Sequence, residues 1–550
     1  MLRRLVGHRR ALRSASVRPR AVVRRPTKTP SPDGPPRAHL LLLPLACTAA
    51  LAATSLLPAV AGTTHLRWAV LGTAGVLAAW TGWLLVQTNR QARALSIAVA
   101  LRPQHYVQAC AQGAVLLYWG WYWRDVYEAA HLFAAQLAFA YAWDLLLTWT
   151  RRSTYPFGFG PVPIVFSINL FLWFKPDWFY LQFALIAVGF AVKECCRWER
   201  NGRMVHVFNP SSFPLGLCAL GLILTGATDL TVGQEIATTF NDPPWIYLVI
   251  FLASLAGQLR FGVATMTMSA VVTMYLFGLV YFAMFGTYYF VDAYIPVAVF
   301  LGMHLLFTDP STSPRTELGR VVFGATYALS VIALYGILGA LGAPTFYDKL
   351  LAVPVMNLLV RGIDRHVSTV VHWRPGLETL FLRPLGRHRH LVHVGVWAMV
   401  FVGISAAQGI GDTHRGQWVS FWQQACADAR PNGCRQFGVL VSTYCERGSG
   451  WACNEYGVLV QPQIRPELAA ALFRRACDLG FSAGCANRGV GQVNDLVRPP
   501  PALDDYELVL RDGTGRQSTS TPLQTYQLAC AQGFTDGCRQ ARRLGGTNEG

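Results

Sequence analysis

The chain of 550 residues is 53% hydrophobic and has a mean hydropathy of +0.31, which excludes an ordinary soluble globular protein. Its formal net charge of +18 is uneven, because residues 1–37 carry ten Arg and Lys28 against one acidic residue, Asp33. This tail is rich in Pro and lacks aromatic side chains, so we expect a disordered basic arm in the cytoplasm. An organelle transit peptide and a nucleic-acid-binding arm are the alternatives, and nucleic acid is not among the partners that we expect.

A succession of apolar runs fills residues 38–410. A bilayer core of ~30 Å is crossed by ~20 residues of helix, and several runs reach that length. The predicted fold class is therefore all-α, with a polytopic helical bundle in the lipid bilayer. About 13 spans are predicted, near 40–62, 67–87, 104–122, 127–149, 162–174, 178–194, 211–227, 245–259, 262–284, 288–307, 321–342, 349–361 and 391–409. The short segments that begin at 162 and 349 are also compatible with re-entrant helices.

Basic residues indicate the orientation, because Lys and Arg resist translocation in short loops. With the basic arm inside, the predicted inside loops hold most of the Lys and Arg, whereas the predicted outside loop 226–244 holds three acidic residues and no basic one. An odd number of spans places the N-terminus inside and the C-terminus outside. We expect a multi-pass protein of the bacterial inner (plasma) membrane, with two additional spans in 38–100, a basic cytoplasmic loop and last span in 371–414, and an exported domain in 415–550.

Eight of the thirteen cysteines fall after residue 425, in four segments of the form C-x7-C. No cysteine in this region is left over, which is typical of a disulfide framework in an oxidising compartment. A zinc site is the alternative, although no histidine follows His414 to complete a mixed ligand set.

The segment PELAAALFRRACDLGFSAGCANRGV (466–490) places small residues where two helices pack closely, with a Gly turn between them. Together with the C-x7-C spacing, it resembles the cysteine-rich secreted branch of the Sel1-like, TPR-related repeat family, over roughly 420–545. The resemblance implies an α-solenoid that binds an exported protein partner, with each disulfide joining the two helices of a hairpin. The implied pairs are Cys426–Cys434, Cys445–Cys453, Cys477–Cys485 and Cys530–Cys538.

Three polar motifs interrupt the apolar pattern between residues 200 and 365, and polar groups in a membrane need a structural or functional reason. The first, NGRMVHVFNPSSF (201–213), predicts a helix capped by Asn209 with Pro210 in its first turn. The second, TDPSTSPRTELGR (308–320), repeats this cap chemistry at Asp309. The third, FYDKLLAVPVMNLLVRGID (346–364), carries Asn357 in a short apolar segment. Each motif is compatible with a helix-end device or with part of a ligand site.

The order of the three motifs resembles the NqrB/RnfD family of membrane flavin subunits in ion-translocating electron-transport complexes, over roughly 101–370. The resemblance implies a bundle that holds FMN or riboflavin and passes electrons toward quinone, beside an ion path and next to other electron-transport subunits. The residues that it implies for non-covalent flavin binding are Asn209, Pro210, Asp309, Thr312, Arg315, Arg320 and Asn357.

The family carries FMN covalently on the Thr of an SGAT-type motif, and TGAT (225–228) would map Thr228 onto that position. This motif lies closer to FNPSSF than the family pattern expects, so a chance match at the end of a span is the alternative. His304, within a predicted span, is compatible with a proton relay or a metal ligand, and alternatively with a packing role.

These observations predict a membrane electron-transport subunit with an exported interaction domain. The alternative is a non-redox membrane transporter or scaffold that keeps the fold without a cofactor. No complete active site is evident, so any catalysis requires other subunits.

Overall fold

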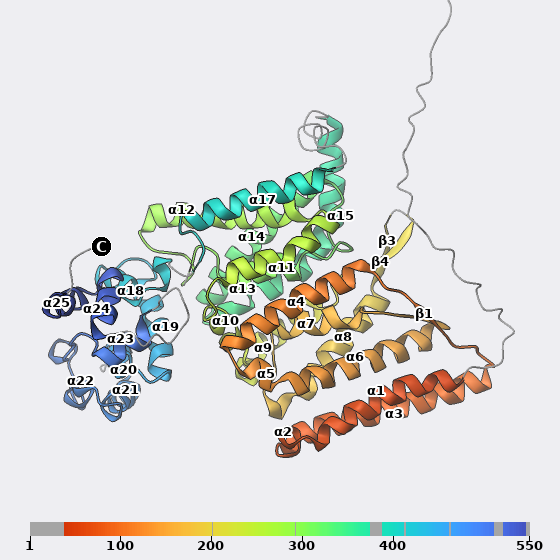
Figure 1. Ribbon diagram of the computed structural model, residues 1–550, viewed down its shortest axis with the longest axis horizontal. Helices are drawn as coiled ribbons and strands as arrows, with labels where there is room; N and C mark the ends of the chain where they lie inside the picture. Colours follow the sequence, from red (N-terminus) through yellow and green to blue (C-terminus); the bar gives the residue numbers. More distant parts are fainter. Residues whose placement is uncertain are drawn as a thin grey trace, which may run out of the picture.

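The computed structural model describes residues 38–545, except 201, 292, 374–387, 412–413, 461–463 and 511–520. The predicted basic arm and most of the predicted basic loop between residues 371 and 389 lie outside the described residues. The described chain is almost entirely helical, which confirms the all-α fold class (Figure 1). Two short β-ribbons were not predicted from the sequence.

The first helices form an antiparallel pair at one edge of the bundle. It consists of η1 (Ala38–Leu41), α1 (Leu42–Ala53), η2 (Thr54–Leu56), α2 (Pro58–Ala61) and α3 (Thr64–Arg90). The break falls where Leu57 is extended, because a residue before proline is pushed out of the helical region. The pair packs against α6 (Figure 1).

Most of the rest of the bundle consists of two sets of five helical elements in the same order. The third helix of each set is short. The first set is α4 (Pro103–Tyr122), α6 (Ala130–Arg151), α7 (Pro161–Asn169), α8 (Tyr180–Cys195) and α9 (Ser212–Thr225). The second set is α11 (Ile246–Phe261), α12 (Ala264–Phe285), α13 (Val297–Leu301) with the π-helical turn η5 (Gly302–Leu306), α14 (Glu317–Ala340) and α15 (Asp348–Trp373). The two first helices pack together, as do the two last. Short connectors between these helices are α5 (Asp125–Glu128), η3 (Pro176–Trp178), η4 (Thr228–Leu230), α10 (Gly233–Thr239) and η6 (Thr345–Tyr347).

Two ends of the bundle can be distinguished (Figure 1). We call one the ribbon end, because it carries a parallel pair, β1 (Ser96–Val99) with β2 (Thr154–Phe157), and an antiparallel pair, β3 (Arg197–Arg200) with β4 (Arg203–His206). At the opposite end, which we call the repeat end, the cysteine-rich domain sits on the loop after α12. The chain reaches that domain through α17 (Arg389–Ala406).

Six helices among the described residues are long and apolar enough to cross a membrane. They are His39–Leu56, Thr64–Arg90, Ala130–Arg151, Ala264–Phe285, Glu317–Ala340 and Arg389–Ala406. Three shorter apolar helices are Ser212–Thr225, Ile246–Phe261 and Val297–Leu306. Each predicted span overlaps a described helix, but the span predicted at 288–307 is helical only from Val297, because extended chain and turns precede Pro296. The count of 13 spans stays a prediction.

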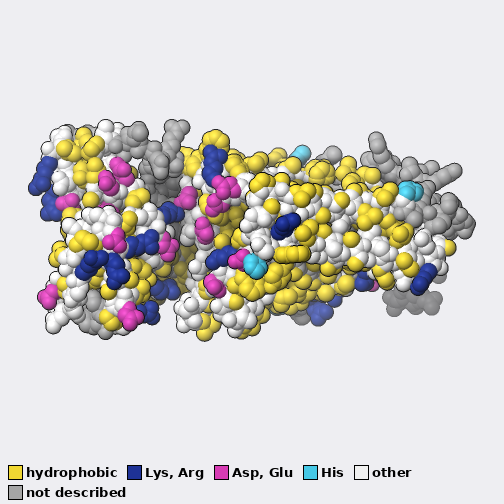
Figure 2. Space-filling model, turned by 90° about the horizontal axis from the view of Figure 1, so that it is seen from below, with side chains coloured by type: hydrophobic (Ala, Val, Ile, Leu, Met, Phe, Trp, Pro, Cys, Tyr) yellow, Lys and Arg dark blue, Asp and Glu magenta, His cyan; other side chains and the backbone are white. Residues whose placement is uncertain are grey.

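Large apolar side chains remain exposed along these helices, among them Trp68, Leu117 and Met399, which are 67%, 65% and 68% exposed. Figure 2 shows hydrophobic side chains over much of the bundle face, whereas charged side chains gather over the cysteine-rich domain and the adjoining end of the bundle. Contiguous apolar surface of this kind is typical of helices that face lipid.

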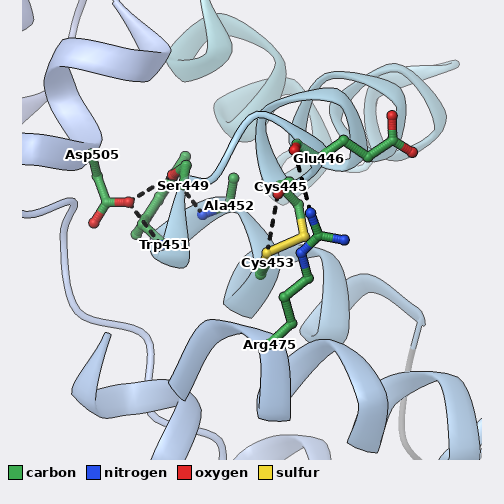
Figure 3. The surroundings of a disulfide bond; sticks show 8 residues. All are labelled: Cys445, Glu446, Ser449, Trp451, Ala452, Cys453, Arg475 and Asp505. Carbon is green, nitrogen blue, oxygen red and sulfur yellow. Dashed lines mark hydrogen bonds between the residues drawn. A yellow bond between two sulfur atoms is a disulfide. The ribbon is translucent and has the colours of Figure 1, made fainter. Parts of the chain in front are cut away.

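The cysteine-rich domain is helical and holds the four predicted disulfides. Its elements are η8 (Arg415–Gln417), α18 (Val419–Ala427), α19 (Gly433–Glu446), α20 (Gly450–Val460), α21 (Pro466–Asp478), α22 (Ser482–Ala486), η9 (Val493–Asp495), α23 (Leu503–Val509), α24 (Pro522–Ala531) and α25 (Thr535–Arg543). Helix α19 carries both Cys434 and Cys445, so the first two hairpins share it. In the second hairpin, Ser449 caps α20 and is itself held by Asp505 (Figure 3).

Candidate functional site

The three polar motifs, far apart in sequence, meet near the ribbon end. Asn209 begins this arrangement, since its Oδ1 accepts hydrogen bonds from the backbone N–H groups of Ser211 and Ser212 at 3.0 and 3.1 Å. These bonds hold the chain at the start of α9, but Ser211, not Asn209, directly precedes the helix, and Pro210 lies before its first turn rather than in it. Pro210 lies against α8, where a side chain at Gly189 would collide with the Pro210 carbonyl.

Asn209 also joins both halves of the bundle. Its backbone N–H donates to Oδ1 of Asn357 on α15 at 2.9 Å, and its Nδ2 donates to the carbonyl of Leu306 at 2.9 Å. Asn209 and Asn357 are 3% and 0% exposed. The Nδ2 of Asn357 is buried and has no hydrogen-bond partner among the described residues, so it is a donor directed into the bundle interior.

The loop between η5 and α14 is organised by Asp309. Its Oδ1 accepts from the Ser311 N–H at 2.9 Å, and its Oδ2 contacts Nε2 of His206 at 2.8 Å. Burial alone would raise the pKa of the Asp309 carboxyl, but His206 and the Ser311 hydrogen bonds hold it below its usual value. Thr312 is buried and donates both its N–H and its hydroxyl to the Asp309 carbonyl. Asp309 and Thr312 therefore shape the loop.

Three arginines surround this loop and differ in their exposure and contacts. Arg200, which is 8% exposed, donates to the carbonyls of Ser311 and Ser313 and pairs with Asp364 on α15. Arg320 donates to three acceptors, namely the Gly262 carbonyl at 2.6 Å, the Pro314 carbonyl at 3.2 Å and Oε1 of Glu317 at 2.8 Å.

Arg315 is the exposed member of the three arginines. Its backbone N–H donates to Asp364, and its guanidinium contacts the Arg200 carbonyl at 3.3 Å. Its side chain therefore lies at the rim of the loop.

Thr228 lies apart from the other predicted site residues. It begins η4 at the far end of α9, and the 14 residues of that helix span ~21 Å from its start near Asn209. Hydrogen bonds and adjacent positions therefore connect seven of the eight predicted cofactor residues, whereas Thr228 lies beyond the opposite end of α9.

A narrow crevice opens beside this site, between α4, α11 and η5. Its lining residues are Val107, Gln108, Ala111, Ser254, Gly257, Gln258, Phe261, Val263, His304, Leu305, Thr308 and Pro310. Its free space for water-sized molecules is about 30 Å³, enough for water or a small ion but not for an isoalloxazine ring.

His304 sits on the π-helical turn, a helix irregularity that is frequent at functional sites. Its Nδ1 lies 2.7 Å from the Phe300 carbonyl, so Nδ1 carries a proton, and in the neutral ring Nε2 is then an acceptor. Nε2 of His304 and Oε1 of Gln258 are both buried without a hydrogen-bond partner among the described residues. The crevice thus offers two acceptors to a water, a proton or a cation.

Sequence reasoning missed His206 and Arg200 as parts of this site. Both lie on the unpredicted β3–β4 ribbon, which aims them at the Asp309 loop. Comparison of the chain with protein-family models, curated proteins and solved structures finds no match. The resemblances to the NqrB/RnfD and Sel1-like families therefore stay predictions.

Proposed function

We propose that the membrane domain is an electron-transport subunit that holds FMN or riboflavin non-covalently at the ribbon end and passes electrons toward quinone within a larger complex. The observation that carries this proposal is the meeting of the three motifs, through the Asn209–Asn357, His206–Asp309 and Arg200–Asp364 contacts. These are the motifs on which the resemblance to the NqrB/RnfD family depends. The chain supplies binding and orientation, the flavin supplies the redox chemistry, and other subunits supply the electrons.

The contacts divide the proposed roles among the site residues. The side chains of Asn209, Asp309 and Arg320 are engaged with the backbone and with neighbouring side chains, so they position the loop. Arg315 is exposed at the loop rim, beside the amino end of α14, where helix N–H groups also favour an anion. Arg315 is therefore the residue that we assign to the negative charge of a flavin phosphate or reduced ring.

We further propose the orientation with 13 spans, the ribbon end in the cytoplasm and the cysteine-rich domain outside. The ribbon end carries Arg152, Lys193, Arg197, Arg200 and Arg320, which agrees with retention of positive charge inside. The four disulfides agree with an oxidising compartment at the other end. In this proposal the exported domain is a Sel1-like solenoid that binds an exported protein partner.

The flavin assignment is tested by the cofactor content of variants purified gently from their own membrane. Arg315→Ala should lower the flavin bound per chain, while Arg260→Ala, at another exposed arginine where α11 ends at the ribbon end, should leave it unchanged. Thr228→Ala should also leave it unchanged, because the proposed flavin is not covalent. Equal flavin content in the Arg315→Ala and Arg260→Ala proteins would remove Arg315 from the site.

A second candidate function is favoured by the crevice at His304. Two unpartnered buried acceptors in a space of water size suit the passage of a proton or small cation better than the binding of a large cofactor. This candidate function corresponds to the alternative of a non-redox membrane transporter that keeps the same fold. It predicts that His304→Ala lowers proton or cation flux into proteoliposomes, and unchanged flux would count against it.

A further inference from the structure

A cluster of one carboxylate and two imidazoles lies at the ribbon end, beside the site described above, which it meets through the contact between Glu317 and Arg320. Glu317 is the first residue of α14, and His390 and His393 lie in the first two turns of α17. One ligand atom from each residue can be chosen so that all three lie within 4.8 Å of one another. The two histidines are three residues apart on one helix, which places them on the same face.

One nitrogen of each histidine in this cluster makes no hydrogen bond within the part of the chain that the structure describes. Nδ1 of His390 and Nδ1 of His393 are both buried with no hydrogen-bond partner among the described residues. Nδ1 of His393 lies 3.9 Å from Oε2 of Glu317, which is beyond hydrogen-bonding distance. Two unpartnered imidazole nitrogens beside a buried carboxylate are a costly arrangement unless a ligand occupies the space between them.

The carboxylate is held in place by a surrounding layer of contacts. Glu317 is 3% exposed, its Oε2 accepts from the Thr265 hydroxyl at 2.8 Å, and its Oε1 pairs with Arg320 at 2.8 Å. Outer contacts of this kind orient metal-binding carboxylates. On the other side, Gly262 makes room for the His390 ring, since a Cβ there would lie 2.2 Å from its Cε1.

We propose that Glu317, His390 and His393 bind a divalent transition-metal ion, with Zn²⁺ as the ion that two imidazoles and one carboxylate favour. Zn²⁺ takes nitrogen and carboxylate oxygen at ~2.0–2.2 Å, so its donors lie ~3.3 Å apart in a tetrahedral site. The 3.9 Å between His393 and Glu317 must therefore contract only slightly. Hard cations such as Mg²⁺ bind imidazole weakly and are excluded from the proposal. The positive charges of Arg320 and Arg389, which act on His393, oppose every dication, so the ligands must supply the selectivity.

The ion would link the start of α17 directly to the start of α14 and, through Thr265, to the start of α12. Thr265 on α12 belongs to the outer layer, Glu317 begins α14, and α17 is the helix that leads to the cysteine-rich domain. This role is independent of flavin and of the crevice at His304, so its test does not depend on the proposed function.

The experiment uses the full chain, purified in detergent through a tag without histidine and depleted of metal with a chelator. Zn²⁺ is added, and bound zinc per chain and the thermal unfolding temperature are measured. We expect about one Zn²⁺ per chain and a higher unfolding temperature. His393→Ala and Glu317→Gln should each weaken zinc binding at least about tenfold, because loss of a ligand should exceed the tenfold effect of a lost outer contact.

His388→Ala is the matched control, since His388 is exposed at the start of the same helix and lies outside the cluster. It should bind zinc as the wild-type chain does. Glu317→Gln preserves the size of the buried side chain, so it keeps the test decisive if His393→Ala does not fold. Zinc binding by the wild-type chain no tighter than by Glu317→Gln, or an equal loss in His388→Ala, would overturn the proposal and leave a metal-free His–Glu contact.

Discussion

At the scale of single residues, buried polar side chains in this protein mainly connect elements that are far apart in the sequence. Asn209 is the clearest case, because its side chain bonds the backbone before α9 and the Leu306 carbonyl of η5, and its backbone N–H donates to Asn357 of α15. Arg200 does the same for the Asp309 loop and α15. Such groups are costly to leave unpaired in a low-dielectric interior, so their removal should be felt well beyond the site.

Replacing Asn209 with Ala should destabilise the membrane domain strongly. The change removes the side-chain hydrogen bonds at the start of α9, worth about 1 kcal/mol, and leaves the Leu306 carbonyl unsatisfied at a further cost of about 1–3 kcal/mol. Thermal unfolding in detergent measures the loss. Thr225→Ala, at an exposed position near the other end of α9, is the control and should change stability little.

Burial of His414 should make the stability of the protein depend on pH at the junction with the cysteine-rich domain. His414 is 2% exposed between the rings of Tyr288 and Tyr294, and its Nδ1 accepts from the Gly416 N–H. Burial lowers its pKa from 6.5 to about 4, so between these values the unfolded chain binds a proton that the folded chain does not. Stability should therefore be fully present above pH 6.5 and fall as the pH is lowered toward 4, by up to about 3 kcal/mol.

The measurement is the unfolding temperature of wild-type and His414→Gln proteins across this pH range. The variant should lose the part of the acid sensitivity that His414 supplies, whereas His65→Gln, at an exposed histidine, should keep it. Identical pH profiles for the wild-type and His414→Gln proteins would contradict the assignment.

At the scale of elements, three of the four disulfide hairpins share a close contact between an alanine and a glycine. The alanine precedes the first cysteine and the glycine precedes the second, as in Ala425/Gly433, Ala476/Gly484 and Ala529/Gly537. A Cβ added at Gly484 would lie 2.5 Å from the Ala476 Cβ, so only glycine lets the helices approach as they do.

Gly484→Ala should therefore destabilise the cysteine-rich domain by about 1–3 kcal/mol through overpacking. Gly491→Ala is the matched control, because a Cβ at that position meets nothing within 4 Å. Chemical denaturation of the two variants, with disulfides intact, gives the difference. Equal stability would mean that the hairpin can open without loss.

The elements also show which features of the fold a local sequence pattern can predict. Apolar runs and C-x7-C spacing are local signals, and they predicted the helices and a disulfide framework. The β1–β2 ribbon depends on pairing between residues far apart, and no local pattern carries that information. The β3–β4 ribbon is instead a local hairpin, and the Asn-Gly pair at 201–202 between its strands is a signal that could have predicted it. Distant partners also decide the contacts of Arg200, whose acceptors are carbonyls on a distant loop, and of Glu317, which meets His390 only after folding.

At the scale of the whole molecule, the proposed orientation has the ribbon end inside and the cysteine-rich domain outside. A reporter that is active only outside the cytoplasm should work when fused after residue 550 and fail when fused after residue 375. The second fusion point follows α15, which ends at the ribbon end. Activity at residue 375 would mean that the number of crossings before it is wrong by one.

The central claim is that this bundle is an electron-transport subunit carrying flavin, and flavin content of the wild-type chain tests it most directly. The protein is purified gently from its own membrane, and its visible absorbance is measured before and after acid precipitation. The account predicts a flavin spectrum in the native protein and release of that flavin into the acid supernatant, since Thr228 lies apart from the proposed site. Native protein without flavin of either kind would contradict the account, and the transporter or scaffold function would take its place.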